Sequence, residues 1–248
     1  MQIDQEKCSG CGICIPYCPA RAITMQDKKA QVDREACLEC GNCARSLVVR
    51  CPKGAFFEEP GLYEGARAAR KFFSDPMTTH AITRIPGRGT EEVKTNDVTG
   101  RVRQGEIGIA IEVGRPCSGA SMEQIQKITK ALAANGVVFE EHNPLTHLMS
   151  DRTTGTIAES YMSEKVVSAI IEFADKAERL PFLLELIKNI AKDLDTVFSL
   201  DLITCFAEDG SIPVMPILTQ LGICPMPNAK INLGLGRPLA PATRGGGN

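Results

Sequence analysis

The alternation of apolar and polar residues is clearest in the second half of the chain. In EIGIAIEV, residues 106–113, every second residue is apolar, which is typical of a half-buried β-strand. Three further segments predict strands: VVFEEH (137–142), VVSAIIEF (166–173) and FSLDLITCF (198–206).

Two segments between these strands have apolar residues at helical spacing. In 121–136, Ile125, Ile128 and Leu132 form one stripe, Ser121 and Gln124 have the spacing of a capping box, and Gly136 ends the helix. LPFLLELIKNIAKDLD (180–195) has the same periodicity, with Pro181 in its first turn. The order β-α-β-β-α-β predicts an α+β domain: an antiparallel sheet with two helices on one face, and an open face or edge available for self-association. This order is similar to that of ligand-sensing domains of the ACT type.

The first 56 residues contain a repeated cysteine pattern. CSGCGICIPYCPARAI occupies residues 8–23 and CLECGNCARSLVVRCPKGAF occupies 37–56. Both contain C-x-x-C-x-x-C and a later C-P, but the gap before the last cysteine is three residues in the first copy and seven in the second. Thiolates are soft ligands, and four of them can hold an iron–sulfur cluster. Zinc sites, clusters that never change redox state, and disulfides are the alternatives to redox-active clusters.

Residues 3–58 resemble the bacterial-type ferredoxins that carry two [4Fe-4S] clusters. The resemblance implies two halves related by a pseudo-twofold axis, each with a short β-hairpin and a helix; AITMQ (22–26) and QVDREA (31–36) supply the first hairpin. It also implies that the fourth cysteine of each repeat binds the opposite cluster. The expected ligands of cluster 1 are Cys8, Cys11, Cys14 and Cys51, and those of cluster 2 are Cys37, Cys40, Cys43 and Cys18. The four extra residues within ARSLVVR (44–50) can add one helical turn and keep Cys51 facing its cluster.

The composition of the whole chain excludes several other classes. Its 248 residues are 43% hydrophobic, enough for a packed core. With 28 basic and 30 acidic residues, the chain is not expected to bind nucleic acid. We see no apolar run near 18 residues and no signal peptide, so we expect neither a membrane span nor export. Eight of the eleven cysteines fall in the first 51 residues at metal-site spacing, which favours a reducing, cytoplasmic environment.

The segment 61–104 is basic, with eight Lys or Arg residues and five acidic ones. LYEGARAARKFF (62–73) predicts a short amphipathic helix that ends before Pro76. The loops 84–103 and 114–121 contain glycines and polar side chains that could bind a carboxylate or phosphate. The alternatives are an ordinary solvated loop for the first and a tight turn without a ligand for the second. The candidate anion-binding residues are Arg84, Arg88, Arg101, Arg115, Ser118 and Ser121.

These patterns divide the chain into four parts: a two-cluster ferredoxin domain (1–60), a basic linker (61–104), a βαββαβ domain (105–209) and a Pro/Gly-rich extension (210–248) that packs on its own domain or on a neighbouring copy of the chain. We assign no role to Cys117, Cys205 and Cys224.

The functional hypothesis is an iron–sulfur protein of anaerobic metabolism that passes single electrons through two [4Fe-4S] clusters to or from a redox partner protein. Its C-terminal domain would dock the partner, sense a ligand or form a homo-oligomer. One alternative is a ferredoxin-dependent reductase, or the small subunit of one. No G-x-G-x-x-G fingerprint for a flavin or nicotinamide is found, which counts against this alternative. The other alternative is a redox- or ligand-sensing regulator.

Overall fold

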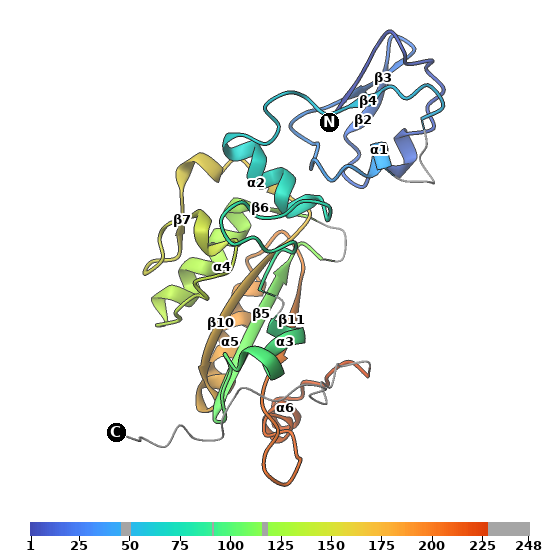
Figure 1. The fold of residues 1–248 in the computed structure, drawn as a ribbon. Helices are drawn as coiled ribbons and strands as arrows, with labels where there is room; N and C mark the ends of the chain where they lie inside the picture. Colours follow the sequence, from blue (N-terminus) through green and yellow to red (C-terminus); the bar gives the residue numbers. More distant parts are fainter. Residues whose placement is uncertain (46–50, 91, 116–118, 228–248) are drawn as a thin grey trace.

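The computed structural model describes residues 1–45, 51–90, 92–115 and 119–227. Figure 1 shows a small N-terminal lobe at one end, a larger α/β part built on a central sheet, and helix α2 (Gly65–Ser74) beside the lobe, at the near end of the α/β part. No helix within the described ranges is long and apolar enough to cross a membrane.

The N-terminal lobe contains two short antiparallel strand pairs. Strand β1 (Gln2–Ile3) pairs with β4 (Phe56–Phe57), and β2 (Ile23–Gln26) pairs with β3 (Lys29–Val32). The second pair is the predicted hairpin, and its two turn residues have positive φ, as tight two-residue hairpins require. The remaining elements are the 3₁₀ helix η1 (Ile15–Tyr17) and helix α1 (Asn42–Arg45). The extra helical turn expected within 44–50 falls mostly on residues 46–50, outside the described residues.

The α/β part is organised around strand β5 (Glu106–Val113). It lies between β10 (Ala169–Lys176) and β11 (Phe198–Ile203), and both pairings are antiparallel. The strand predicted at 106–113 is confirmed, and its four alternating apolar side chains are at most 1% exposed. These four residues are Ile107, Ile109, Ile111 and Val113. Gly108 and Ala110 are buried as well, so the strand is not half-buried as expected.

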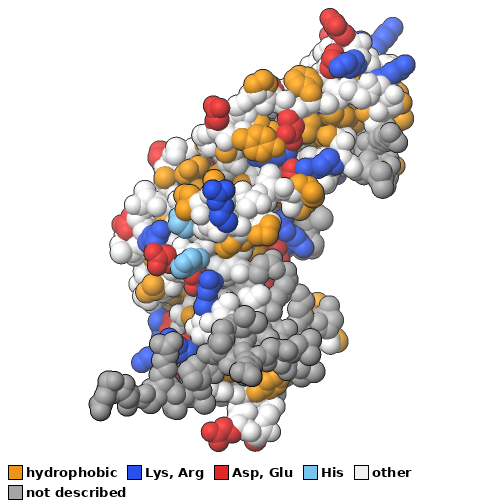
Figure 2. Space-filling view, viewed as in Figure 1, with side chains coloured by type: hydrophobic (Ala, Val, Ile, Leu, Met, Phe, Trp, Pro, Cys, Tyr) orange, Lys and Arg blue, Asp and Glu red, His pale blue; other side chains and the backbone are white. Residues whose placement is uncertain are grey.

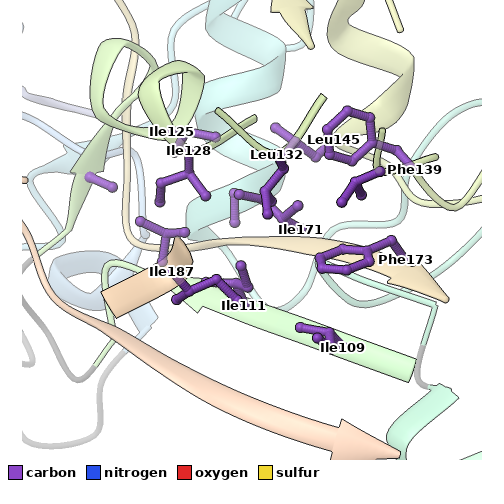
Figure 3. Close-up of a cluster of buried hydrophobic side chains, with 14 of the residues drawn as sticks. Ile109, Ile111, Ile125, Ile128, Leu132, Phe139, Leu145, Ile171, Phe173 and Ile187 are labelled. Carbon is purple, nitrogen blue, oxygen red and sulfur yellow. The ribbon is translucent and has the colours of Figure 1, made fainter. Parts of the chain in front are cut away.

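Helices α4 (Met122–Ala134) and α5 (Leu180–Ala191) cover this apolar face of the sheet. Figure 3 shows Ile125 and Leu132 of α4 directed toward the side chains of Ile111, Ile171 and Phe173 on the strands. Burying a side chain of this size contributes about 1.5–3 kcal/mol, so this layer is the main core of the molecule.

The predicted start and end of α4 are confirmed. The hydroxyl of Ser121 accepts a hydrogen bond from the backbone N–H of Gln124 at 3.3 Å. Gly136 follows the helix with φ +79°, a conformation that glycine adopts without steric cost.

The strand predicted at 137–142 does not form and is replaced by a single bridge between Phe139 and Phe173. The chain leaves the sheet because the side chain of Asn143 accepts a hydrogen bond from the N–H of Leu145 and donates to the carbonyl of Ile170, which stabilises a turn. The sheet therefore has three strands, in the order β10-β5-β11, and the predicted four-stranded βαββαβ arrangement is not confirmed.

Two predicted strands also differ in their limits. The strand expected at 166–173 is β10, which begins at Ala169 and ends at Lys176, and the strand expected at 198–206 ends at Ile203.

The smaller elements lie mostly between α4 and α5. Two are short antiparallel strand pairs: β6 (Ala120–Ser121) with β9 (Lys165–Val166), and β7 (Met149–Asp151) with β8 (Thr156–Ile157). The others are the 3₁₀ helices η2 (Thr146–Leu148), η3 (Glu159–Tyr161) and η4 (Ala177–Arg179).

The basic segment between the lobe and the sheet contains two helices. The helix predicted at 62–73 is α2, and a second helix, α3 (Glu92–Thr99), lies within the stretch expected to be a loop. Val102 covers the second face of the sheet at Gly108, where an added Cβ would be 2.8 Å from Cγ2 of Val102. The face expected to be open for self-association is therefore partly covered by this segment.

The Pro/Gly-rich extension packs on its own domain as far as it is described. Helix α6 (Met215–Gln220) follows Val214, and both Val214 and Leu218 belong to the main core. Residues 228–248 lie outside the described part of the chain.

Candidate metal centre

The lobe contains two cavities, each lined by four cysteines. Cavity 1 is lined by Cys8, Cys11, Cys14 and Cys51, with apolar neighbours that include Ile3, Ala30 and Ala55. Cavity 2 is lined by Cys18, Cys37, Cys40 and Cys43, with apolar neighbours that include Ile23, Val32 and Leu38. Each cavity has about 380 Å³ of space free of protein atoms, counted out to open solvent. Each takes three cysteines from one repeat and the fourth from the other.

A backbone turn before the first cysteine of each repeat positions that cysteine. The carboxylate of Asp4 accepts hydrogen bonds from the backbone N–H groups of Glu6 and Lys7, at 2.9 and 3.2 Å. The backbone carbonyl of Asp4 accepts a third bond, from the N–H of Cys8 at 3.0 Å. Asp33 repeats this arrangement before Cys37, with distances of 2.9, 3.3 and 3.0 Å. The sequence signal is D-x-x-x-C in both copies, because an aspartate that binds its own following backbone favours a turn.

Backbone N–H groups point at the cysteine sulfurs. Ala22 N–H donates to Cys18 Sγ at 3.3 Å, and Ala55 N–H makes the equivalent bond to Cys51 Sγ at 3.4 Å. The first cysteine of each repeat also accepts such a bond, Cys8 from Ala30 at 3.5 Å and Cys37 from Glu39 at 3.4 Å. Hydrogen bonds to sulfur stabilise negative charge there and are one of the means by which a protein tunes a cluster.

The cavities favour the protonated form of their thiols. Burial raises the pKa of Cys14 in cavity 1 and of Cys37 and Cys40 in cavity 2. Burial, followed by the charges of Cys40 and Cys37, raises the pKa of Cys43 to about 12. Without a bound cation these thiols therefore stay protonated, because burial and neighbouring negative charge disfavour the thiolate.

Within the described ranges, no three Cys, His, Asp or Glu side chains converge closely enough to hold one metal ion.

Basic residues of α1 and α2 surround cavity 2, and the sequence interpretation missed their role. Arg45 donates to the carbonyl of Cys40 at 2.8 Å and forms an ion pair with Asp75 at 2.6 Å. Arg67 forms an ion pair with Glu39, which lies between two cysteines of cavity 2, at 2.7 Å. The sequence did contain a sign of this role. Arg67, Arg70 and Lys71 have the spacing i, i+3, i+4, which puts three cations on one face of the predicted helix.

The residues predicted to bind an anion have different partners where they are described. Arg88 and Arg115 approach the carboxylate of Glu112 at 3.8 and 3.6 Å. Arg101 approaches Glu140 at 3.8 Å. The other candidates are Arg84, which is exposed, Ser121, which caps α4, and Ser118, which lies outside the described residues. Cys117 also lies outside them, and Cys205 and Cys224 are free thiols.

Residues 1–24 match the family model of a 4Fe-4S binding domain. A 24-residue segment of the chain is 71% identical to a heterodisulfide reductase subunit-like protein of Archaeoglobus profundus. The aligned segment is 10% of this chain and only 3% of that protein. No solved structure matches the chain.

Proposed function

We propose that this protein transfers single electrons to or from a redox partner protein through two [4Fe-4S] clusters, one in each cavity of the lobe. The observation that carries the proposal is the pair of similar cavities, each lined by four cysteines drawn from both repeats. In this proposal Cys8, Cys11, Cys14 and Cys51 hold cluster 1, and Cys37, Cys40, Cys43 and Cys18 hold cluster 2. The bound clusters supply the one-electron chemistry, and the chain holds them, excludes water and orients N–H donors at their sulfur ligands.

Access to cavity 1 supports exchange with an external partner. Cys11 is exposed, and its neighbour in the lining, Ile13, is 44% exposed. Tyr17 and Phe57 are 50% and 46% exposed on the same lobe. Figure 2 shows apolar side chains on the visible face of the lobe beside charged groups of both signs. A surface of this kind suits a transient contact with a redox protein.

The α/β part would serve as an adaptor that docks the partner or senses a ligand. A reducing, cytoplasmic and anaerobic setting belongs to the same proposal, because cluster-bound thiolates at exposed positions are prone to oxidation.

A second candidate is a reductase that converts a substrate itself, which the name of the archaeal relative favours. The two candidates differ in whether turnover needs a second protein. A carrier only passes electrons on, whereas a reductase would convert its substrate when it is supplied with a chemical reductant alone.

Reversible reduction tests the proposal. We expect the anaerobically purified protein to be brown, to bleach on addition of dithionite with the appearance of cluster EPR signals, and to recover when an electron acceptor is added. A brown protein that neither bleaches nor develops an EPR signal under reducing conditions would carry structural clusters, and the electron-transfer proposal would be rejected.

A further inference from the structure

Arg70 of α2 connects the ligand loop of cavity 2 to the α/β part. Its side chain is buried, and its Nη1 donates to the carbonyls of Glu35 at 3.1 Å and Cys37 at 3.0 Å. On the other side, Nε forms an ion pair with the carboxylate of Glu164, and Nη2 donates to the carbonyl of Ser163 at 3.3 Å. One buried guanidinium therefore joins the first ligand residue of cavity 2 to a carboxylate of the other part of the molecule.

The same ligand loop touches the α/β part at a second point. A Cβ added to Gly119 would lie 3.7 Å from Cδ1 of Leu38, the residue that follows Cys37. Cavity 1 differs, because no guanidinium among the described residues donates to a backbone carbonyl of its four cysteines (Cys8, Cys11, Cys14 and Cys51). As far as the structure describes them, the two cavities are therefore similar in their linings and different in their guanidinium contacts.

We propose that Arg70 is a positioning residue for cluster 2 alone, and that Glu164 of the α/β part sets the reduction potential of that cluster through Arg70. This inference rests on the proposed function, since it requires a cluster in cavity 2. A positive charge near a cluster favours its more negative, reduced form and raises the potential. The Glu164 carboxylate offsets the charge of Arg70, so the net effect on cluster 2 depends on how closely the two groups are paired.

The position of Glu164 depends on the start of α4. Its backbone carbonyl accepts a hydrogen bond from the N–H of Met122, the first residue of that helix, at 3.0 Å. A shift of this end of α4 would change the Arg70–Glu164 pairing and, with it, the potential of cluster 2. The ion pair thus gives the α/β part a physical means of acting on one cluster and not on the other.

The test is an anaerobic redox titration of the full chain, followed by EPR, in which the signals are assigned to the clusters with Cys18→Ala and Cys51→Ala variants. Glu164→Gln removes the offsetting charge, and we expect the midpoint potential of cluster 2 to rise. Arg70→Met removes the positive charge, and we expect the potential to fall. Cluster 1 should not shift in either variant.

Opposite shifts separate an electrostatic role from a structural one, because general loosening of the lobe would move both variants in the same direction. The matched control is Arg179→Met, which breaks the 2.7 Å ion pair to Asp175 within the α/β part. It should shift neither cluster. Shifts of the same sign, equal shifts of both clusters, or no shift of cluster 2 would overturn the inference. If Arg70→Met does not fold, two variants of Glu164 decide the question. The midpoint potential of cluster 2 should rise in Glu164→Gln and stay unchanged in Glu164→Asp, which keeps the negative charge. A wild-type protein without clusters would instead refute the proposed function.

Discussion

Gly10 and Glu39 occupy equivalent positions in the two cysteine repeats, and both have positive φ, +71° and +55°. The conformation costs glycine little, whereas glutamate adopts it at an expense that the buried ion pair of Glu39 with Arg67 helps to offset. The turn between the first two cysteines is thus the same in both repeats, although the residues that make it differ. Only the second repeat uses this position to contact α2.

Replacing Gly10 with alanine should selectively damage cavity 1. The added Cβ would lie 2.1 Å from the carbonyl oxygen of Lys28, and positive φ adds strain. The two effects together should cost about 2–5 kcal/mol. We expect loss of iron and of the cluster 1 EPR signal, with the cluster 2 signal retained. Gly54→Ala is the control, since Gly54 also has positive φ but an added Cβ meets no atom within 4 Å. Equal loss of iron in both variants would show that strain, not the contact with Lys28, controls the site.

Lys71→Met should destabilise the junction between the lobe and α2. Burial would lower the pKa of Lys71, but hydrogen bonds to Asp75 and Glu58 outweigh it and raise the pKa. The amine lies 2.7 Å from Asp75 Oδ2, and both side chains are 1% exposed. Removing one partner of such a buried pair costs about 3–5 kcal/mol. Thermal unfolding under argon should show a clear fall in Tm.

The matched control for this variant is Lys7→Met. Lys7 pairs with Asp4 at 3.1 Å, but its side chain is 61% exposed. An exposed pair of this kind is worth at most about 1 kcal/mol. Similar falls in Tm for the two variants would contradict the importance that we assign to the buried pair.

Glu172→Gln should remove a pH dependence of stability. Burial raises the pKa of the Glu172 carboxyl above its ordinary value of 4.5, and the oxygen Oε2 accepts hydrogen bonds from Thr90 N–H at 2.7 Å and Asn143 Nδ2 at 2.6 Å. Because the folded state binds this proton more tightly than the unfolded state, the free energy of unfolding falls as the pH rises from 4.5 through the folded pKa. A glutamine amide oxygen can accept both bonds without carrying charge.

We therefore expect Glu172→Gln to be more stable than the wild type at neutral pH and to lose that advantage below pH 4.5. Denaturant unfolding across this range measures the difference directly. The exposed Glu178→Gln should follow the wild-type profile at every pH. A Glu172→Gln profile parallel to that of the wild type would rule out titration of Glu172 as the cause.

The local patterns of the sequence predicted the elements that depend on local interactions. The alternation in 106–113 corresponds to β5, and the Ser121–Gln124 spacing corresponds to the cap of α4. Both features depend on residues that are close together in the sequence, so a local pattern can reveal them. The strand expected at 137–142 failed because the side chain of Asn143 binds the backbone of Leu145 and of the distant Ile170, and the resulting turn takes the chain off the sheet.

The surroundings of the cysteines could not be predicted in the same way. The partners of Arg70 lie 33 or more positions away in the sequence, at Glu35, Cys37 and Glu164, so no local pattern connects them. The same reasoning applies to Arg88, a candidate anion-binding residue. Its charge faces Glu112, a residue of β5 that comes next to it only in the folded chain, and the anion site stays a prediction.

The iron and sulfide content of the anaerobically purified chain, measured together with the EPR spectrum of Cys51→Ala, tests the central claim most directly. The proposed ligand count predicts about eight irons and eight sulfides per chain. It also predicts that Cys51→Ala alters the cluster held by Cys8, Cys11 and Cys14 while the signal of the other cluster is retained. About four irons in the wild type, a zinc-loaded colourless protein, or loss of the cluster held by Cys37, Cys40 and Cys43 in Cys51→Ala would contradict it.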